Sequence, residues 1–172
     1  MELYIRNKWI SLRGSSYVRD TNENDVYRIQ GKFWTFTRKK FVRDLEGKDL
    51  YIVRNKFWWL FHRRAFVIDP ETQEIVATLT KKIFTFHDHY NIASKYGNIV
   101  VRGNFFGFDY HIYLNDVEVG HVSRKISLRD SFVLTLNDDV KDVPFYIALV
   151  IAVDNITDQQ ASDGASWSSS SN

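Results

Sequence analysis

Two segments of the sequence place aromatic rings directly beside clusters of basic side chains. Residues 33–40 read Phe-Trp-Thr-Phe-Thr-Arg-Lys-Lys, and residues 57–64 read Phe-Trp-Trp-Leu-Phe-His-Arg-Arg. Tryptophan favours the membrane–water interface, and each lysine or arginine near an anionic membrane adds ~1 kcal/mol of attraction. The pattern therefore predicts a site for anionic phospholipid headgroups. Its basic residues are Arg38, Lys39, Lys40, Arg63, Arg64, Lys81 and Lys82, and its membrane-interface aromatic residues are Trp58 and Trp59.

The same segments allow two other interpretations. Bases of a single-stranded nucleic acid could stack on the rings while the cations follow the phosphates, but we disfavour nucleic acid as the partner. Alternatively, the rings fill a β-rich core and the cations form its solvated outer face. This second interpretation is the simplest, because a large core needs many inward-facing rings. The rings concerned are Trp34, Phe36, Trp58 and Phe61.

Five histidines are candidate metal ligands: His62, His87, His89, His111 and His121. The second and third are two residues apart, so on a strand they share one face, and a histidine cluster can bind Zn²⁺ or another divalent ion. A metal-dependent enzyme would require three of the five to converge on one point. Histidine pairs on amphipathic strands are more commonly solvated side chains. We therefore predict no metal ligand and no cofactor.

The sequence carries no recognised catalytic motif. It lacks a Gly-x-Ser-x-Gly nucleophile elbow, a phosphate-binding glycine loop and a His-Glu-x-x-His zinc motif. It has no cysteine, which excludes disulfides, zinc–thiolate sites and a cysteine nucleophile, and which suits a reducing cytoplasm. The carboxylate pair Asp138–Asp139 falls in a turn, where solvation and capping explain it. We therefore predict that the chain is not an enzyme.

The elements that would position these residues are mainly strands. Short β-type runs recur at close spacing with turn residues between them, which is typical of a β-sandwich or β-barrel. Three hairpins, starting at Phe41, Phe66 and Ile112, each have a second strand that leads into basic residues, and this repetition fits a meander. The clearest runs are residues 26–29, 50–53, 66–68, 74–79, 98–102, 108–114, 117–122 and 132–136.

One C-terminal segment differs from all the others. Every residue from 145 to 153 is apolar, so a helix formed there has no polar stripe and must be enclosed. Asp142 suits the N-cap, Pro144 suits the first turn, and Asp154–Asn155 ends the run. Ala148 and Ala152 would let strand backbones approach closely. Nine residues fall short of the ~20 that span a bilayer, so we predict a buried helix.

An enclosed helix needs walls on every side. A sheet curled into a closed barrel supplies them and also leaves no exposed strand edge. We therefore predict one mainly β domain over residues 1–156, a closed antiparallel β-barrel around a central hydrophobic C-terminal helix. Residues 157–172 are polar and serine-rich, and we predict a disordered tail.

Charge is unevenly distributed along the 172 residues. The net charge is +2, but residues 1–129 carry +8 and residues 130–172 carry −6. A basic body attracts anionic surfaces. The first residues lack the basic start and apolar run of a secretory signal. We expect a cytoplasmic protein that acts peripherally at the membrane.

The order of these hairpins and the helix resembles the LURP-one-related proteins of the tubby C-terminal-like superfamily. The resemblance covers about residues 3–156 and implies a twelve-stranded barrel threaded by the helix. Related proteins include the phosphoinositide-binding tubby proteins and the phospholipid scramblases, and no catalytic residue set defines the family. The segments that carry it are Tyr27-x-Ile29-x-Gly31, Val42-x-Asp44-x-x-Gly47, Phe66-x-Ile68-Asp69, His89-Tyr90-x-Ile92 and residues 145–154.

Together these observations favour a non-enzymatic binding or membrane-tethering module for anionic phospholipid headgroups. One alternative is a protein-interaction or signalling scaffold, which requires a protein partner and predicts an exposed apolar patch. The other is the metal-dependent enzyme with clustered histidines.

Overall fold

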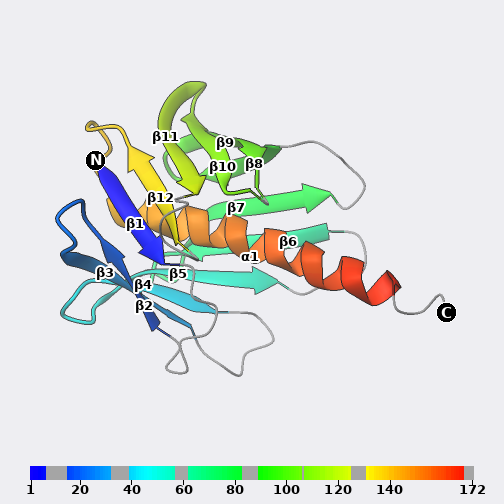
Figure 1. Cartoon of the computed structure of the whole chain (residues 1–172), viewed down its shortest axis with the longest axis horizontal. Helices are drawn as coiled ribbons and strands as arrows, with labels where there is room; N and C mark the ends of the chain where they lie inside the picture. Colours follow the sequence, from blue (N-terminus) through cyan, green and yellow to red (C-terminus); the bar gives the residue numbers. More distant parts are fainter. Residues whose placement is uncertain are drawn as a thin grey trace.

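In the part of the chain that the computed structural model describes, twelve strands form one closed antiparallel barrel around a single helix (Figure 1). The structure describes residues 1–6, 15–31, 39–56, 62–82, 89–105, 107–124 and 131–168, with backbone only for residues 6, 15, 56, 62–63, 81–82, 131 and 158–168. The elements are β1 (Glu2–Arg6), β2 (Ser15–Arg19), β3 (Asp25–Gly31), β4 (Lys40–Arg43), β5 (Asp49–Lys56), β6 (His62–Ile68), β7 (Ile75–Lys82), β8 (His89–Ser94), β9 (Gly97–Asn104), β10 (Asp109–Leu114), β11 (Val117–Arg124), β12 (Ser131–Leu136) and α1 (Val143–Ser168).

The strands follow one another around the barrel in sequence order. Each pairs antiparallel with the next, and β1 closes the ring by pairing with β12, where Leu3 lies opposite Leu134. A closed meander has no sheet edge, and its connections alternate between the two ends of the barrel. The predicted mainly β, twelve-stranded barrel with a C-terminal helix is confirmed.

The connections at one end are short and built from turn-forming residues. Asp69 Oδ1 accepts hydrogen bonds from the backbone N–H groups of Glu71 and Thr72, at 2.8 and 3.1 Å. Asp44 Oδ1 accepts in the same way from the N–H of Lys48 at 2.8 Å. These side chains replace backbone partners inside tight turns. The N–H donors also stabilise the ionised form of Asp69, so its pKa lies below the usual value.

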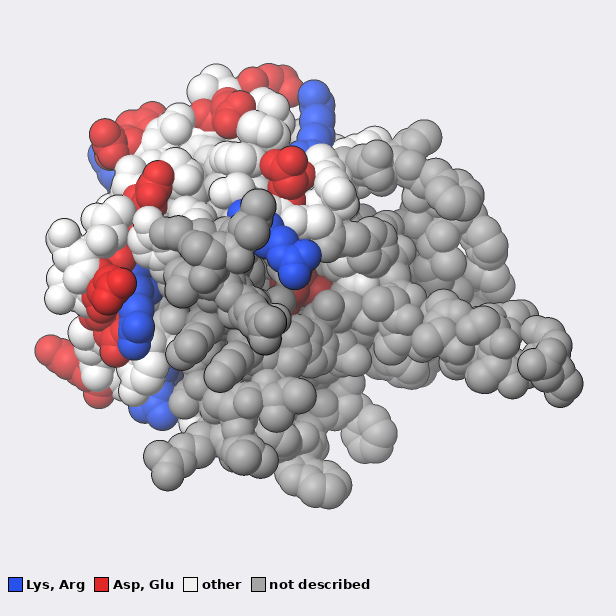
Figure 2. All heavy atoms as spheres, in the orientation of Figure 1, with Lys and Arg blue, Asp and Glu red and all other residues white. Residues whose placement is uncertain are grey.

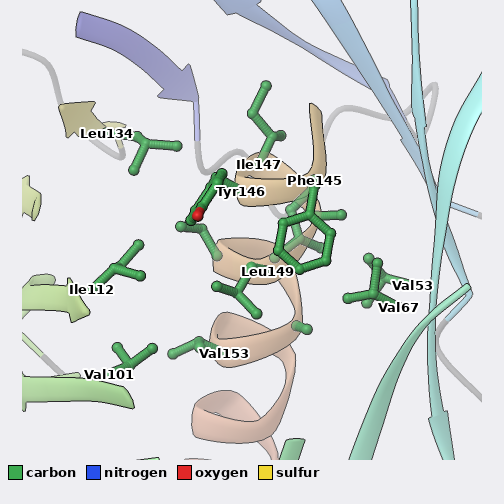
Figure 3. Close-up of a cluster of buried hydrophobic side chains, with 14 of the residues drawn as sticks. Val53, Val67, Val101, Ile112, Leu134, Phe145, Tyr146, Ile147, Leu149 and Val153 are labelled. Carbon is green, nitrogen blue, oxygen red and sulfur yellow. The ribbon is translucent and has the colours of Figure 1, made fainter. Parts of the chain in front are cut away.

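Alternating strand residues line the interior of the barrel. Val53 on β5 and Val67 on β6 point inward from one wall, and Val101, Ile112 and Leu134 point inward from the opposite wall (Figure 3). All of them are buried against α1 in one continuous hydrophobic core. Burial of each such side chain contributes roughly 1.5–3 kcal/mol.

The first part of α1 fills the barrel completely. None of the side chains of residues 145–153 is more than 4% exposed, which confirms that this apolar run is enclosed. Phe145 points toward the β5–β6 wall (Figure 3), and helical periodicity places Ala148 and Ala152 on the same side. The helix approaches β5 and β6 more closely than the other strands. The two alanines explain this approach, because they keep that side of the helix narrow.

The helix continues beyond the apolar run. Asp154–Asn155 ends that run, and α1 extends to Ser168. Both residues are buried, at 7% and 1% exposure, so the barrel wall still surrounds the helix at this point. The hydroxyl of Thr157 donates to the carbonyl of Val153 at 3.0 Å and holds this turn in the helix. The expected end of the domain at residue 156 stays a prediction.

Candidate functional site

The barrel has two distinct ends. We call one the turn end, formed by residues 20–24, 44–48, 69–74, 95–96, 115–116 and 137–142. We call the other the exit end, because α1 leaves the barrel there (Figure 1). Strands β1, β3, β5, β7, β9 and β11 finish at the exit end, and each even-numbered strand begins there.

The two ends differ sharply in the sequences that join their strands. Turn-end segments contain eleven acidic residues, three basic residues and one aromatic residue. Acidic side chains are accordingly spread over the left and upper parts of the face in Figure 2. Exit-end strands are joined by segments with seven basic, two acidic and thirteen aromatic residues. Those segments are residues 7–14, 32–39, 57–61, 83–88, 105–108 and 125–130.

Several predicted headgroup-binding residues lie on neighbouring strands at the exit end. Strand pairing places Arg63 of β6 opposite Lys81 of β7, and Arg64 of β6 opposite Lys56 of β5. Lys82 lies opposite His62, and the Arg64 side chain is exposed. Like charges placed directly opposite each other destabilise strand pairing. The pairing of basic residues with basic residues therefore does not stabilise the barrel.

The predicted site residues Lys39 and Lys40, at the start of β4, contact other parts of the protein. Lys40 Nζ lies 3.6 Å from Asp154 Oδ2, so this lysine neutralises a buried carboxylate of α1. Lys39 Nζ lies 5.1 Å from the ring centroid of Phe41 and is partly buried. Lys40 thus joins the barrel wall to the helix, whereas Lys39 packs on a neighbouring ring of the wall. The pairing of Lys40 could not be read from the sequence, because it joins residues 114 positions apart.

The remaining predicted residues cannot be placed. Arg38, Trp58 and Trp59 lie outside the described residues, and so do Trp34, Phe36 and Phe61, which the structural interpretation assigned to the core. For Arg63, Lys81 and Lys82 the structure gives strand positions only.

The interior of the barrel becomes polar toward the exit end. Asn55 and Asn155 are each 1% exposed, and both carry buried polar atoms that lack a hydrogen-bond partner in the described part of the chain. The Tyr110 hydroxyl is in the same situation. Burial, reinforced by the negative charge of Asp154, raises the pKa of Tyr110 well above its usual value. Buried polar groups without a hydrogen-bond partner lower the stability of an apolar core, so this layer marks a change from a purely apolar to a mixed interior.

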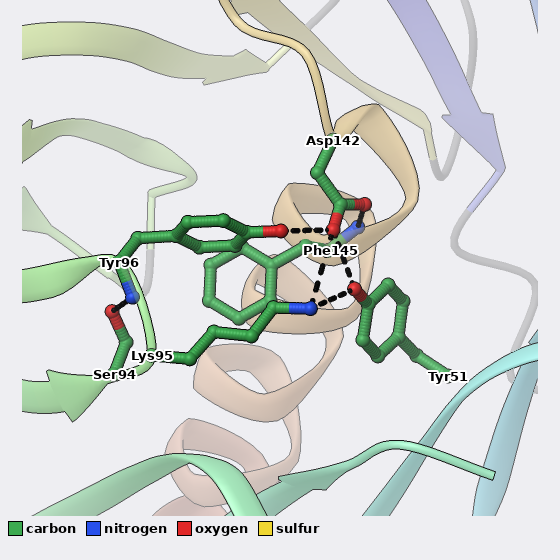
Figure 4. Close-up of polar contacts among 6 residues, drawn as sticks. All are labelled: Tyr51, Ser94, Lys95, Tyr96, Asp142 and Phe145. Carbon is green, nitrogen blue, oxygen red and sulfur yellow. Dashed lines mark hydrogen bonds and ion pairs between the residues drawn. The ribbon is translucent and has the colours of Figure 1, made fainter. Parts of the chain in front are cut away.

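The turn end instead holds a well-paired polar cluster at the start of α1 (Figure 4). Asp142 is the N-cap, as the sequence predicts, and its Oδ1 accepts the N–H of Phe145 at 3.1 Å. Its Oδ2 accepts the hydroxyls of Tyr51 and Tyr96 and lies 3.6 Å from Lys95 Nζ. Lys95 Nζ also donates to the Tyr51 hydroxyl at 2.9 Å. The cluster fastens the helix to β5 and to the β8–β9 turn.

Burial and this carboxylate together keep the surrounding tyrosines protonated. Burial is the main cause that raises the pKa of Tyr51 and Tyr96 above the usual value, and the hydrogen bonds to Asp142 add to it. Burial likewise raises the pKa of Tyr146 to about 12. With one carboxylate held by two hydroxyls, an ammonium and a helix N-terminus, the arrangement is suited to anchoring.

A match to a protein-family model shows which family the chain belongs to. The model of the family described as LURP-one-related matches residues 1–154, which includes all the described strands and the apolar run of α1, residues 145–153. The chain belongs to the LURP-one-related family. The resemblance seen in the order of hairpins and helix is thus confirmed.

A solved structure shares the fold of this LURP-one-related chain. It is the crystal structure of a protein from Arabidopsis thaliana, with a TM-score of 0.63 and 16% sequence identity. The match covers 91% of this chain and 90% of the other. At this identity the likeness concerns the fold alone. A comparison with curated protein sequences gives no match.

Two of the histidines of this LURP-one-related domain lie next to each other, and a third lies apart from them. His111 on β10 and His121 on β11 are directly paired across strands. His89 lies on β8, and β9 separates it from His111. His87 and the side chain of His62 lie outside the described residues. Among the described histidines, no three converge as the metal-dependent enzyme requires.

Two further features bear on the partner of this LURP-one-related domain. Within the described ranges, no helix combines the length and the apolarity needed to cross a bilayer. Among the residues that the structure describes, the large apolar side chains that are exposed come from several different strands and turns. They are Met1, Tyr17, Leu45, Ile75, Tyr96 and Val117.

Proposed function

We propose that this LURP-one-related domain is a non-enzymatic binding or tethering module for anionic phospholipid headgroups, cytoplasmic and peripheral at the membrane. The exit end of the barrel would face the headgroups. The observation that carries the proposal is the set of like-charged residues on paired strands, Arg63 opposite Lys81 and Arg64 opposite Lys56. Since this pairing works against the fold, an anionic partner is the simplest reason for it.

The charge difference between the two ends supports the same orientation. The turn-end segments have an excess of acidic residues, and the exit-end segments have an excess of basic residues. Near an anionic membrane, such a charge distribution turns the basic end toward the surface and keeps the acidic end away from it. Binding would therefore be oriented as well as electrostatic.

Aromatic content adds a second contribution. Four of the five tryptophans and nine of the thirteen phenylalanines belong to the exit-end segments, Trp58 and Trp59 among them. Tryptophan rings are favourable at the headgroup level of a bilayer, where one side is apolar and the other is hydrated. Rings and cations at one end of a barrel would combine interfacial partition with attraction to anionic lipid.

Co-sedimentation with vesicles tests the proposal. The full chain is mixed with phosphatidylcholine vesicles that either contain or lack an anionic lipid, phosphatidylserine or a phosphoinositide. We expect the chain to sediment with the anionic vesicles at low salt and to dissociate near 1 M salt, where the Debye length falls to about 3 Å. If anionic vesicles bind no more protein than neutral ones at low salt, the proposal is wrong.

A pair of charge-reversal variants locates the binding surface. The double variant Arg63→Glu/Arg64→Glu should weaken binding by at least ~2 kcal/mol, roughly thirtyfold, because two cations are lost and two anions take their place. It should not lose stability, since both new glutamates lie opposite lysines. The matched control, Lys48→Glu/Lys141→Glu, makes the same charge change at the turn end and should bind almost normally. Equal losses in both variants would contradict binding through the exit end.

A further inference from the structure

A compact group of side chains of the types that can bind metal ions lies on the outer wall of the barrel. His111 and His121 come from paired strands, and their rings stack with centroids 4.3 Å apart and planes inclined by 20°. Asp109 lies beside them on β10. One donor atom from each of these three residues falls within 4.8 Å of the other two. None of the three residues belongs to the exit-end segments or to the Asp142 cluster.

Each imidazole in this group contacts a carboxylate. His121 Nε2 lies 3.0 Å from Asp109 Oδ1, and His111 Nδ1 lies 2.9 Å from Glu118 Oε1. A carboxylate acceptor at Nδ1 favours the tautomer in which Nδ1 carries the proton, and this leaves Nε2 of His111 unprotonated, with a lone pair that can bind a metal ion. This carboxylate–histidine arrangement is the one that commonly orients a metal-ligating histidine.

We propose that Asp109, His111 and His121 bind a divalent transition-metal ion of the Zn²⁺ type, with Glu118 orienting His111. Two imidazoles and a carboxylate suit Zn²⁺, and also Ni²⁺ or Cu²⁺, better than they suit Mg²⁺ or Ca²⁺. The proposal departs from the expectation from sequence that the histidines are merely solvated.

The distances suit such an ion after a small adjustment. Ligand bonds of ~2.0–2.2 Å in tetrahedral geometry place donor atoms roughly 3.3 Å apart. The present separations, at most 4.8 Å, therefore need to close by about 1.5 Å at most. The side chains of Asp109, His111 and His121 are 70%, 43% and 32% exposed, so they can rotate without disturbing the core. This exposure also allows water to complete the coordination.

The surrounding charge is compatible with a cation. Asp109 and Glu118 bring two carboxylates to the group. The basic residue on the adjoining strand β9 is Arg102, which lies opposite His111. Its guanidinium lies over the ring of Tyr113, 5.4 Å from the centroid. A bound dication would thus be neutralised by the two carboxylates.

A β-bulge is what brings the two histidines together. The register of the β10–β11 hairpin shifts by one residue between Ile112 and Tyr113, and β11 carries the extra residue. Without the shift, His121 would lie opposite Tyr110, whose side chain is fully inside the barrel. With it, His121 lies opposite His111 on the outer wall. Bulges that redirect a side chain are common beside functional sites.

Metal titration of the tag-free full chain tests the proposal. Isothermal titration with Zn²⁺ should show one saturable site, and Co²⁺ in its place should give the visible absorption bands of a site with nitrogen and oxygen ligands. Glu118→Gln should weaken binding roughly 10- to 100-fold, because it removes the partner that orients His111. His111→Gln, His121→Gln and Asp109→Asn should each weaken it at least as much, because each removes a ligand.

The control is His89→Gln, an exposed histidine on β8 that does not belong to the group. It should bind Zn²⁺ like the unmodified chain. All of the substituted side chains lie on the outer wall, so thermal melting without metal should be unchanged and should confirm that each variant folds. The proposal is wrong if the unmodified chain shows no saturable site, or if His89→Gln weakens binding as much as His121→Gln.

Discussion

The turn end and the exit end of the barrel meet the same structural requirement in different ways. Both must join antiparallel neighbours, for which two residues suffice, and the β8–β9 and β10–β11 turns at the turn end use only two each. The segments between strands at the exit end run from four to eight residues and contain most of the tryptophan and phenylalanine. The extra length and aromatic content exceed what chain connection needs.

This difference separates what the fold requires from what a partner could use. At the turn end, carboxylates cap turns and the helix, so they have identifiable structural partners such as the N–H groups that Asp44 and Asp69 bind. At the exit end, cations oppose cations across paired strands. Loops held by a rigid scaffold commonly carry function. The exit end is accordingly where a substitution should change binding more than it changes stability.

The largest effect on stability is expected at the start of α1. Asp142→Ala removes the helix N-cap and leaves the hydroxyl of buried Tyr51 without its acceptor. Together these losses should lower the free energy of unfolding by about 3 kcal/mol. Urea unfolding measures the change. Asp142→Asn, which keeps a capping oxygen, should recover part of it, and equal losses in both variants would show that the cap contributes little.

Asp154 is the corresponding acidic residue of α1 near the exit end. It is 7% exposed, and its partner Lys40 is 29% exposed. Asp154→Ala should therefore cost about 2 kcal/mol, since removal of one member of a partly buried pair leaves the other uncompensated. Urea unfolding of Asp154→Ala and Asp142→Ala compares how much each acidic residue contributes to the free energy of unfolding. A larger loss of stability in Asp154→Ala would contradict the expected order.

Alkaline pH should affect the turn end through its tyrosines. Tyr51, Tyr96 and Tyr146 all have a raised pKa in the folded protein. Below pH ~10 these groups are neutral in both states, so their contribution is complete. Above it the unfolded chain ionises first, and stability falls by up to about 1.4 kcal/mol per pH unit for each such tyrosine. Urea midpoints measured from pH 8 to 11.5 should show this fall.

Tyr51→Phe provides the control for this pH dependence. The variant is less stable at neutral pH, because it loses the hydrogen bonds to Asp142 and Lys95. Its stability should nevertheless decline less steeply above pH ~10, since one titrating group is gone. An unchanged slope would exclude Tyr51 as a contributor.

The smallest effect is expected at a turn that serves geometry alone. Gly47 has φ = 93°, and a Cβ added there would meet nothing within 4 Å. Gly47→Ala should therefore cost only the conformational strain of a left-handed residue, about 1 kcal/mol. Thermal melting detects it, and vesicle binding should not change. A loss of vesicle binding in this variant would assign a role in binding to the turn end.

The sequence predicts the centre of this fold better than its margins. The apolar run of residues 145–153 determines an enclosed helix, and the enclosing barrel follows from it. By contrast, the five residues of β2 include only one buried hydrophobic side chain, Val18, so this strand lacks a clear alternating pattern. Asp154 and Asn155 end the apolar run, but α1 continues through them, because Lys40 neutralises Asp154 and the barrel still surrounds both residues.

The candidate sites depend on register, which a single sequence does not give. The recurrence of basic residues after the second strand of each hairpin predicts a meander, and the observed meander brings the ends of these strands to one end of the barrel because its connections alternate. The meeting of His111 with His121 could not be predicted, since the bulge between them changes which face of β11 is outward. Lys40 likewise depends on a partner far away in sequence.

Closure of the barrel by β1 and β12 has a consequence for biosynthesis. Strand β1 can pair with β12, with Leu3 opposite Leu134, only after β12 has been synthesised. The helix that fills the interior is translated after both strands. During synthesis on the ribosome, the strands are therefore present before the helix that packs inside them. Their inward-facing valines and isoleucines lack this main packing partner until the segment after residue 143 has emerged. Contacts this distant in sequence slow folding. The domain should therefore complete its folding in one late step, in which the barrel closes around its own helix.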